Sequence, residues 1–192
     1  MSEDSPPNPP NLGVVGMLIF LSALTMLFLA SLLAYTMIRV GGRFAPPSGA
    51  LHVPGLFWIS TGVILISSFT IQHALGCVRR EKQSHFKLSM TATLGLALLF
   101  IAIQTPALAH LLAEHERLRA HNMNLYGLMF CLVLLHAAHV LGGLIPMVVI
   151  WIKALRGGYD HEQHRPVRYL TMYWHFLDAV WLLMFTTLLT LA

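Results

Sequence analysis

Charged residues are the scarcest feature of this 192-residue chain. Only 10% of its residues are Asp, Glu, Lys or Arg, whereas 56% are hydrophobic. A soluble domain usually carries about 25% charged residues, so this chain has too few of them to cover a water-facing surface. The high apolar content also excludes an intrinsically disordered chain. The composition therefore predicts an integral membrane protein with a single domain.

Motifs of the common catalytic classes are also missing. The sequence has no Gly-rich phosphate loop, no activated Ser or Cys nucleophile and no paired carboxylates. Its net charge of +4 comes from basic residues scattered over connections, so it does not indicate nucleic acid. The two cysteines, Cys77 and Cys131, lie in apolar runs without Cys-x-x-Cys spacing. They are predicted to be two buried thiols rather than a disulfide or a metal pair.

Five long apolar runs lie between the sparse charges. Each is long enough for a membrane-spanning helix, which needs about 20 residues, and too long for a barrel strand of about 9–11. The predicted fold is an all-α integral membrane protein, with a bundle of five transmembrane helices in domain 12–192 and a Pro-rich tail at 1–11. The predicted spans are residues 12–38, 56–78, 88–112, 123–152 and 169–192.

The distribution of Lys and Arg predicts the orientation of the bundle. Connections on the side of the N-terminal tail carry eight of these residues and those on the other side carry four. Since cytoplasmic loops are enriched in Lys and Arg, the tail is predicted to be cytoplasmic and the C-terminus to lie outside. The eight residues are Arg79, Arg80, Lys82, Lys87, Lys153, Arg156, Arg165 and Arg168.

A few polar residues interrupt the predicted spans, and Asp178 is the only acidic one. Such groups usually face the interior of a bundle, because exposure to hydrocarbon is costly. Asp178 shares a helix face with His175, and His136 shares one with His139, since residues three apart are neighbours on a helix. These four residues predict an interhelical polar cluster linking the fourth and fifth spans. Proton handling and contact with lipid headgroups are the alternatives.

The eleven histidines raise the possibility of a cofactor. Two His on different helices can hold haem, and imidazole also binds copper. The histidines within the spans lie at staggered depths, so no metal or haem is predicted in this chain; a stand-alone haem-binding electron carrier is the alternative. Five histidines fall in connections and are expected to be solvated: His85, His115, His121, His161 and His164.

Basic residues at the end of the second span suggest contact with lipid. His73 lies about two turns before Arg79 and Arg80. An arginine side chain offers a planar fork that matches two phosphate oxygens. His73, with Arg79 or Arg80, is therefore predicted to contact a lipid phosphate between the second and third helices. Ordinary enrichment of basic residues in cytoplasmic loops explains the two arginines equally well.

Two motifs carry a resemblance to a known family. The fifth span contains YWHFLDAVW and the fourth contains LHAAHVLGG. They resemble the closing signature and the His-x-x-His-Val-x-Gly-Gly motif of cytochrome c oxidase subunit III, and the resemblance extends from about Gly16 to the C-terminus. Five helices match the short bacterial form of that family. One departure is Leu24, which stands where the family usually has a glutamate.

The resemblance implies a function. Subunit III is an accessory subunit of proton-pumping haem–copper terminal oxidases, packs against the catalytic subunit I in the bacterial inner membrane, and carries no redox centre. Haem and copper would then belong to partner subunits, and phospholipid would occupy a cleft between the first two helices and the other three. A subunit III-like partner of a quinol oxidase or of a nitric oxide reductase is the nearest alternative, because electron donors dock on other subunits.

Overall fold

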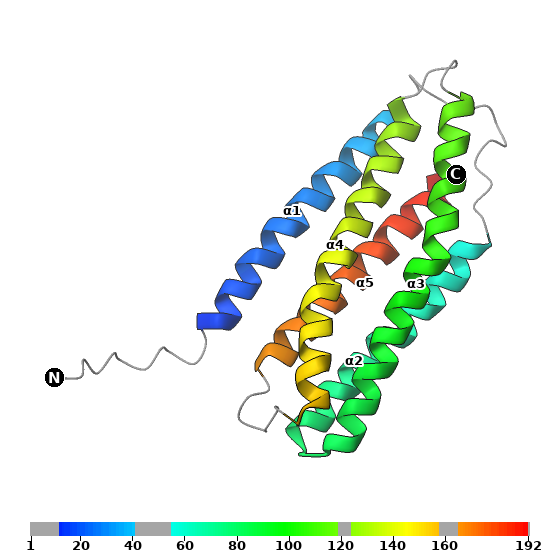
Figure 1. The fold of residues 1–192 in the computed structure, drawn as a ribbon. Coiled ribbons are helices and arrows are strands. Elements are labelled where there is room, and N and C mark those ends of the chain that lie inside the picture. Colours follow the sequence, from blue (N-terminus) through cyan, green and yellow to red (C-terminus); the bar gives the residue numbers. More distant parts are fainter. Residues whose placement is uncertain (1–11, 41–54, 119–123, 158–164, 192) are drawn as a thin grey trace.

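The computed structural model describes residues 12–40, 55–118, 124–157 and 165–191 (Figure 1). These residues form five helices and no strand, which confirms the predicted all-α class. The predicted tail at 1–11 lies outside the described residues. The helices are α1 (Leu12–Val40), α2 (Leu56–Arg79), α3 (Gln83–Leu118), α4 (Asn124–Leu155) and α5 (Arg165–Leu191).

Four of these helices are long and apolar enough to cross a membrane: α1, α2, α3 over Gln83–Pro106, and α4 over Phe130–Leu155. The fifth predicted span, now α5, does not reach the same apolar content. Its sequence includes two arginines, His175 and Asp178. Yet α5 runs along the others through the middle of the bundle, in contact with α1, α2 and α4 (Figure 1). Its polar side chains can therefore face other helices instead of lipid.

The connection between α2 and α3 is shorter than predicted. The sequence suggested a turn over residues 79–87, but α2 continues to Arg79 and α3 begins at Gln83. The backbone N–H groups of Arg80 and Lys82 both donate to the Cys77 carbonyl, at 3.2 and 3.1 Å. Glu81 takes a left-handed conformation with φ of 58°, which is uncommon for a residue with a side chain. This tight turn holds the start of α3 directly beside the end of α2.

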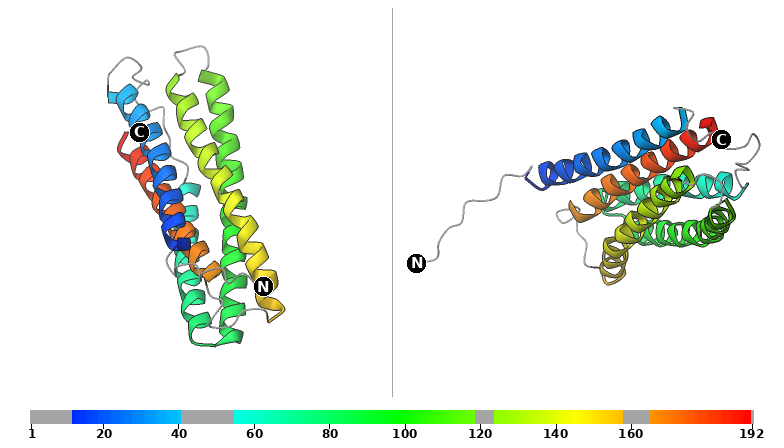
Figure 2. Two further views of the ribbon diagram at one scale, coloured as in Figure 1. Left: turned by 90° about the vertical axis from the view of Figure 1, so that its left-hand side faces the viewer. Right: turned by 90° about the horizontal axis from the view of Figure 1, so that it is seen from above.

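The helices do not group as the resemblance implied. A cleft was expected between the first two helices and the last three, but α2 packs most extensively against α3 and also contacts α5. It is α1 that stands apart, with its main contacts to α4 and α5, while α3 lies on the opposite side of the bundle (Figure 2). The described residues do not show the expected cleft, and the short turn keeps α2 beside α3.

The main core lies between α2, α3, α4 and α5. Trp174 and Trp181 from α5 are almost completely buried there, and the Trp181 ring stacks on Phe57 with ring centres 5.8 Å apart. A smaller cluster attaches α1, in which Phe28 and Tyr35 pack against α4 and α5. The aromatic residues of α5 thus connect both halves of the interior.

Candidate functional site

The seam between α2 and α5 holds the best-connected polar residues within the membrane region. Ser68 Oγ lies 2.6 Å from His175 Nδ1, and Gln72 Oε1 lies 3.1 Å from His175 Nε2. Because an amide oxygen only accepts, Nε2 donates to Gln72, and Nδ1 shares a hydrogen bond with the Ser68 hydroxyl. The imidazole therefore bridges two successive turns of α2. Both partners of His175 lie on α2, whereas the sequence predicted that His175 would help to link α5 to α4.

Both buried tryptophans of α5 also bond to α2. Trp174 Nε1 donates to Ser67 Oγ and Trp181 Nε1 donates to Thr61 Oγ1, each at 3.0 Å. Sequence reasoning missed these acceptors. The sequence does contain a spacing that could have indicated them. Thr61 and Ser67 lie six residues apart on α2, close to the seven-residue spacing of the two indoles on α5. Hydrogen bonds to buried indoles fix the register of the two helices.

The four residues of the predicted polar cluster do not form one hydrogen-bonded network. Asp178 is buried beside the Ser68 hydroxyl, but neither carboxyl oxygen has a hydrogen-bond partner of normal geometry among the described residues. Both ring nitrogens of His136 are likewise unpaired there, and its ring lies 5.5 Å from that of Trp181. His139 bonds to the Leu135 carbonyl of its own helix at 2.7 Å. The structure thus connects His175 to α2, and packs His136 and His139 among aromatic rings.

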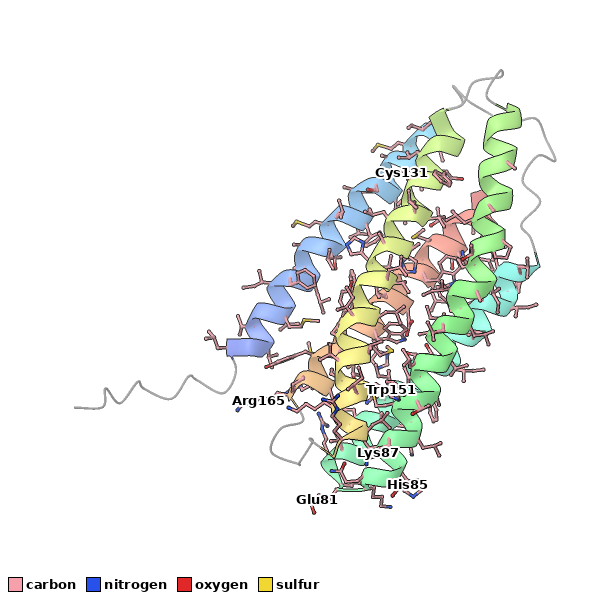
Figure 3. All side chains as sticks on the ribbon, viewed as in Figure 1. Glu81, His85, Lys87, Cys131, Trp151 and Arg165 are labelled. Carbon is pink, nitrogen blue, oxygen red and sulfur yellow. The ribbon has the colours of Figure 1, made fainter. Side chains whose placement is uncertain are left out.

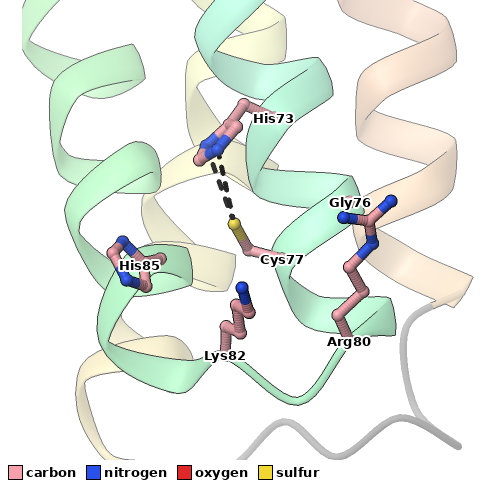
Figure 4. Close-up of a pocket in the computed structure, with 6 residues that line it drawn as sticks. All are labelled: His73, Gly76, Cys77, Arg80, Lys82 and His85. Carbon is pink, nitrogen blue, oxygen red and sulfur yellow. Dashed lines mark hydrogen bonds between the residues drawn. The ribbon is translucent and has the colours of Figure 1, made fainter.

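A second polar site lies at the α2–α3 turn, where a pocket of about 280 Å³ opens between the two helices (Figure 4). Side chains from α2, the turn and α3 line it: His73, Gly76, Cys77, Arg80, Lys82 and His85. His73 Nδ1 lies 2.9 Å from Ser89 Oγ on α3, which fixes the ring at the inner end of the pocket. In Figure 4, Lys82 extends from the turn toward Cys77, and His85 faces the same space from α3.

The pocket includes two of the three residues predicted to bind lipid. His73 and Arg80 line it, while Arg79 is exposed at the end of α2 and does not. Sequence reasoning missed Lys82 and His85, because both were assigned to a solvated loop. A shorter turn and an earlier start of α3 would have indicated them, since Lys82 then immediately precedes α3 and His85 lies in its first turn, next to the end of α2.

An apolar groove of about 830 Å³ lies between the first part of α1 and the helices α4 and α5. Its walls include Met17 and Phe20 from α1, Ile145 and Val149 from α4, and Tyr173 from α5. Tyr173 donates a hydrogen bond to the His139 carbonyl at 3.0 Å, which holds the ring across the base of α1. This groove has a different place from the cleft that the resemblance implied.

The cysteines and histidines show no metal arrangement in the described part of the chain, where no group of three or more possible ligands is close enough to hold an ion. Both cysteines are free. Cys77 is buried, as predicted, but Cys131 is exposed on α4, so that prediction was wrong for it. Cys131 lies toward the end of α4 that is away from the α2–α3 turn (Figure 3).

Comparison with known proteins shows the family of this five-helix bundle. The sequence model of cytochrome c oxidase subunit III matches residues 11–191, and so covers all five helices. The chain belongs to the cytochrome c oxidase subunit III family. In this subunit III chain the YWHFLDAVW segment lies in α5. It contains the two tryptophans and the histidine that bond to α2, and the buried Asp178.

Similar proteins carry a more specific description. One, described as a probable quinol oxidase subunit 3 of Staphylococcus epidermidis, is 31% identical over 189 residues, covering 95% of this chain and 90% of that protein. A protein of Staphylococcus saprophyticus with the same description is 29% identical over 177 residues, covering 92% and 87%. These matches identify an oxidase subunit III and a multi-pass membrane protein.

Proposed function

We propose that this chain is a non-redox accessory subunit of a bacterial respiratory terminal oxidase, packed against the catalytic subunit I in the inner membrane. The match of the subunit III family over residues 11–191 is the observation that carries the proposal. Haem and copper would reside in the partner subunits, where oxygen is reduced to water. The polar residues of α2 and α5 would then serve to hold this subunit's helices in register.

Quinol is the electron donor that the relatives favour for the complex. The similar staphylococcal proteins are described as probable quinol oxidase subunits. Cytochrome c is the second candidate, because the family as a whole is described as cytochrome c oxidase subunit III. The donor docks on other subunits, so the difference concerns the complex rather than the residues of this chain.

The outward surface of α1 supports an assembly role. Only 11% of the residues in its most apolar window are buried within the chain, and large hydrophobic side chains such as Met26 and Met37 point outward. In a bilayer such a surface can contact either lipid or the apolar helices of another subunit. A helix held loosely to its own bundle is well suited to pack against a neighbouring membrane protein.

Co-purification tests this proposal directly. A tag on the N-terminal tail at residues 1–11 should isolate the chain together with a haem-containing subunit, and the preparation should consume oxygen with quinol. Activity with reduced cytochrome c and not with quinol would assign the other donor. A chain that purifies alone and shows a stoichiometric Soret band would contradict the proposal and favour a haem-binding carrier.

The orientation can be tested separately. The excess of Lys and Arg at the α2–α3 and α4–α5 connections supports a cytoplasmic location for that end of the bundle. Alkaline phosphatase, which is active only outside the cytoplasm, can be fused after residue 82 or after the C-terminus. Activity is expected from the C-terminal fusion only, and the reverse pattern would invert the topology.

A further inference from the structure

We propose that the pocket at the α2–α3 turn binds a phosphate group, carried by an anionic lipid headgroup or by a free phosphate. The pocket has a defined set of walls from two helices and the turn between them (Figure 4). The proposal concerns this chain alone and stands whether or not the chain assembles with an oxidase.

The charge of the pocket selects an anion. Arg80 and Lys82 both line it, and no Asp or Glu is among its lining residues. In the described part of the chain, the side chains of Arg80, Lys82 and His85 have no hydrogen-bond or ion-pair partner. Lys87 at the same end of the bundle differs, since its Nζ donates to the Leu155 carbonyl at 3.2 Å. Arg80 and Lys82 therefore give this pocket two cationic side chains and no acidic one.

The donors in the pocket match the oxygens of a phosphate. An arginine fork can bond two phosphate oxygens at once, and a lysine ammonium adds a third charge-assisted bond. His85 contributes a ring N–H in either protonation state. The α3 helix begins at Gln83, so the partial positive charge of its amino end lies beside the same space. His73 bonds to Ser89 and lies against Cys77 Sγ at 3.6 Å, which makes it a wall of the pocket.

The size and place of the pocket fit a headgroup. A volume of about 280 Å³ is at the lower limit for small-molecule sites and suits a phosphate with its nearest substituents. Labelled residues in Figure 3 show that His85, Lys87 and Arg165 share this end of the bundle, whereas Cys131 lies toward the opposite end. His73 lies about 9 Å along α2 from Arg79, so the pocket extends from the end of this helix into its apolar span.

A matched pair of variants tests the assignment. Arg79 and Arg80 are adjacent, exposed and identical in type, but only Arg80 lines the pocket. Native mass spectrometry of the full chain in detergent can measure binding of dioleoylphosphatidylglycerol, with dioleoylglycerol as the ligand that lacks phosphate. Arg80→Gln is expected to weaken phosphatidylglycerol binding roughly tenfold, the loss of one charge-assisted hydrogen bond. Arg79→Gln is expected to bind as the wild type does.

The outcomes separate the alternatives. Equal binding by the two variants, or equal binding of the lipids with and without phosphate, would overturn the proposal. Displacement of the lipid by excess inorganic phosphate would assign a free phosphate site, and retention of the lipid would assign a lipid site. If Arg80→Gln loses its helical circular dichroism, Lys82→Gln replaces it in the same comparison. Co-purification with an oxidase is a separate readout, so either proposal can fail without the other.

Discussion

Helices α1 and α2 show opposite relations between apolar character and burial. The most apolar window of α1 has 11% of its residues buried within the chain, whereas that of the less apolar α2 has 44%. In water the more apolar helix would be the more buried. In a bilayer lipid is as apolar as leucine, so hydrophobicity gives a helix no reason to enter the bundle. Packing and polar contacts decide which helix becomes the core.

The polar side chains of the two helices follow the same division. The hydroxyls of Ser22, Thr25 and Ser31 on α1 all donate to carbonyls of their own helix. On α2, Thr61 and Ser67 accept bonds from the indoles of α5. These two hydroxyls also donate to carbonyls of their own helix, as those of α1 do, so the difference is the additional bond that each accepts from α5. Four substitutions measure this difference, in order of decreasing effect.

Removing Trp181 should have the largest effect. Trp181→Ala empties the centre of the core and removes the bond to Thr61, so the free energy of unfolding should fall by about 3–5 kcal/mol. SDS titration in mixed micelles measures this change. Trp58→Ala is the control, because Trp58 lies on α2 with 60% of its side chain exposed. An equal loss of stability in both variants would show that burial in the core does not determine the cost of removing a tryptophan.

Phe28 should be the residue that attaches α1. Its ring is 3% exposed and lies 5.3 Å from that of His139 on α4, so Phe28→Ala should cost about 3 kcal/mol. Met26→Ala removes a side chain of the same helix that is 76% exposed and should change little. The same SDS titration compares them. A larger loss for Met26→Ala would mean that α1 packs on its other face.

Two adjacent glycines test the contact between α4 and α5. A Cβ at Gly143 would lie 2.7 Å from Cε1 of Tyr173, whereas a Cβ at Gly142 meets nothing within 4 Å. Gly143→Ala must displace the Tyr173 ring and should destabilise the chain by about 1–3 kcal/mol. Gly142→Ala, with the same change in helix propensity, should not. Thermal unfolding in detergent measures both, and similar values for the pair would contradict this packing.

The smallest effect is expected at Ser68. Ser68→Ala removes the bond to His175 between α2 and α5, and interhelical bonds in membranes average about 0.6 kcal/mol. Ser22→Ala on α1 removes only a bond to its own helix and should be neutral. A double-mutant cycle with His175→Phe isolates the pair. A coupling energy of zero would show that this contact contributes nothing to holding the two helices together.

The sequence by itself determined the class of the protein and the number of its helices. Long apolar runs with charges between them require helices that span a bilayer, because backbone groups have no water to bond with there. Residue types also indicated Asp178, His175 and the histidines of α4 as interior positions, and His136 and Asp178 are indeed buried. The family followed from the YWHFLDAVW and LHAAHVLGG motifs, which lie on the two helices that meet at Gly143 and Tyr173.

Only the tertiary structure decided which polar groups meet. Periodicity placed His175 and Asp178 on one face of α5, but that face turned out to meet Ser68 and Gln72 of α2. The pocket lined by Arg80, Lys82 and His85 likewise depends on a tight turn that the charged residues of the connection concealed. In hydrocarbon any apolar face can turn toward lipid at little cost, so the pattern of a helix does not select its partner. Close packing and the length of each connection make that choice.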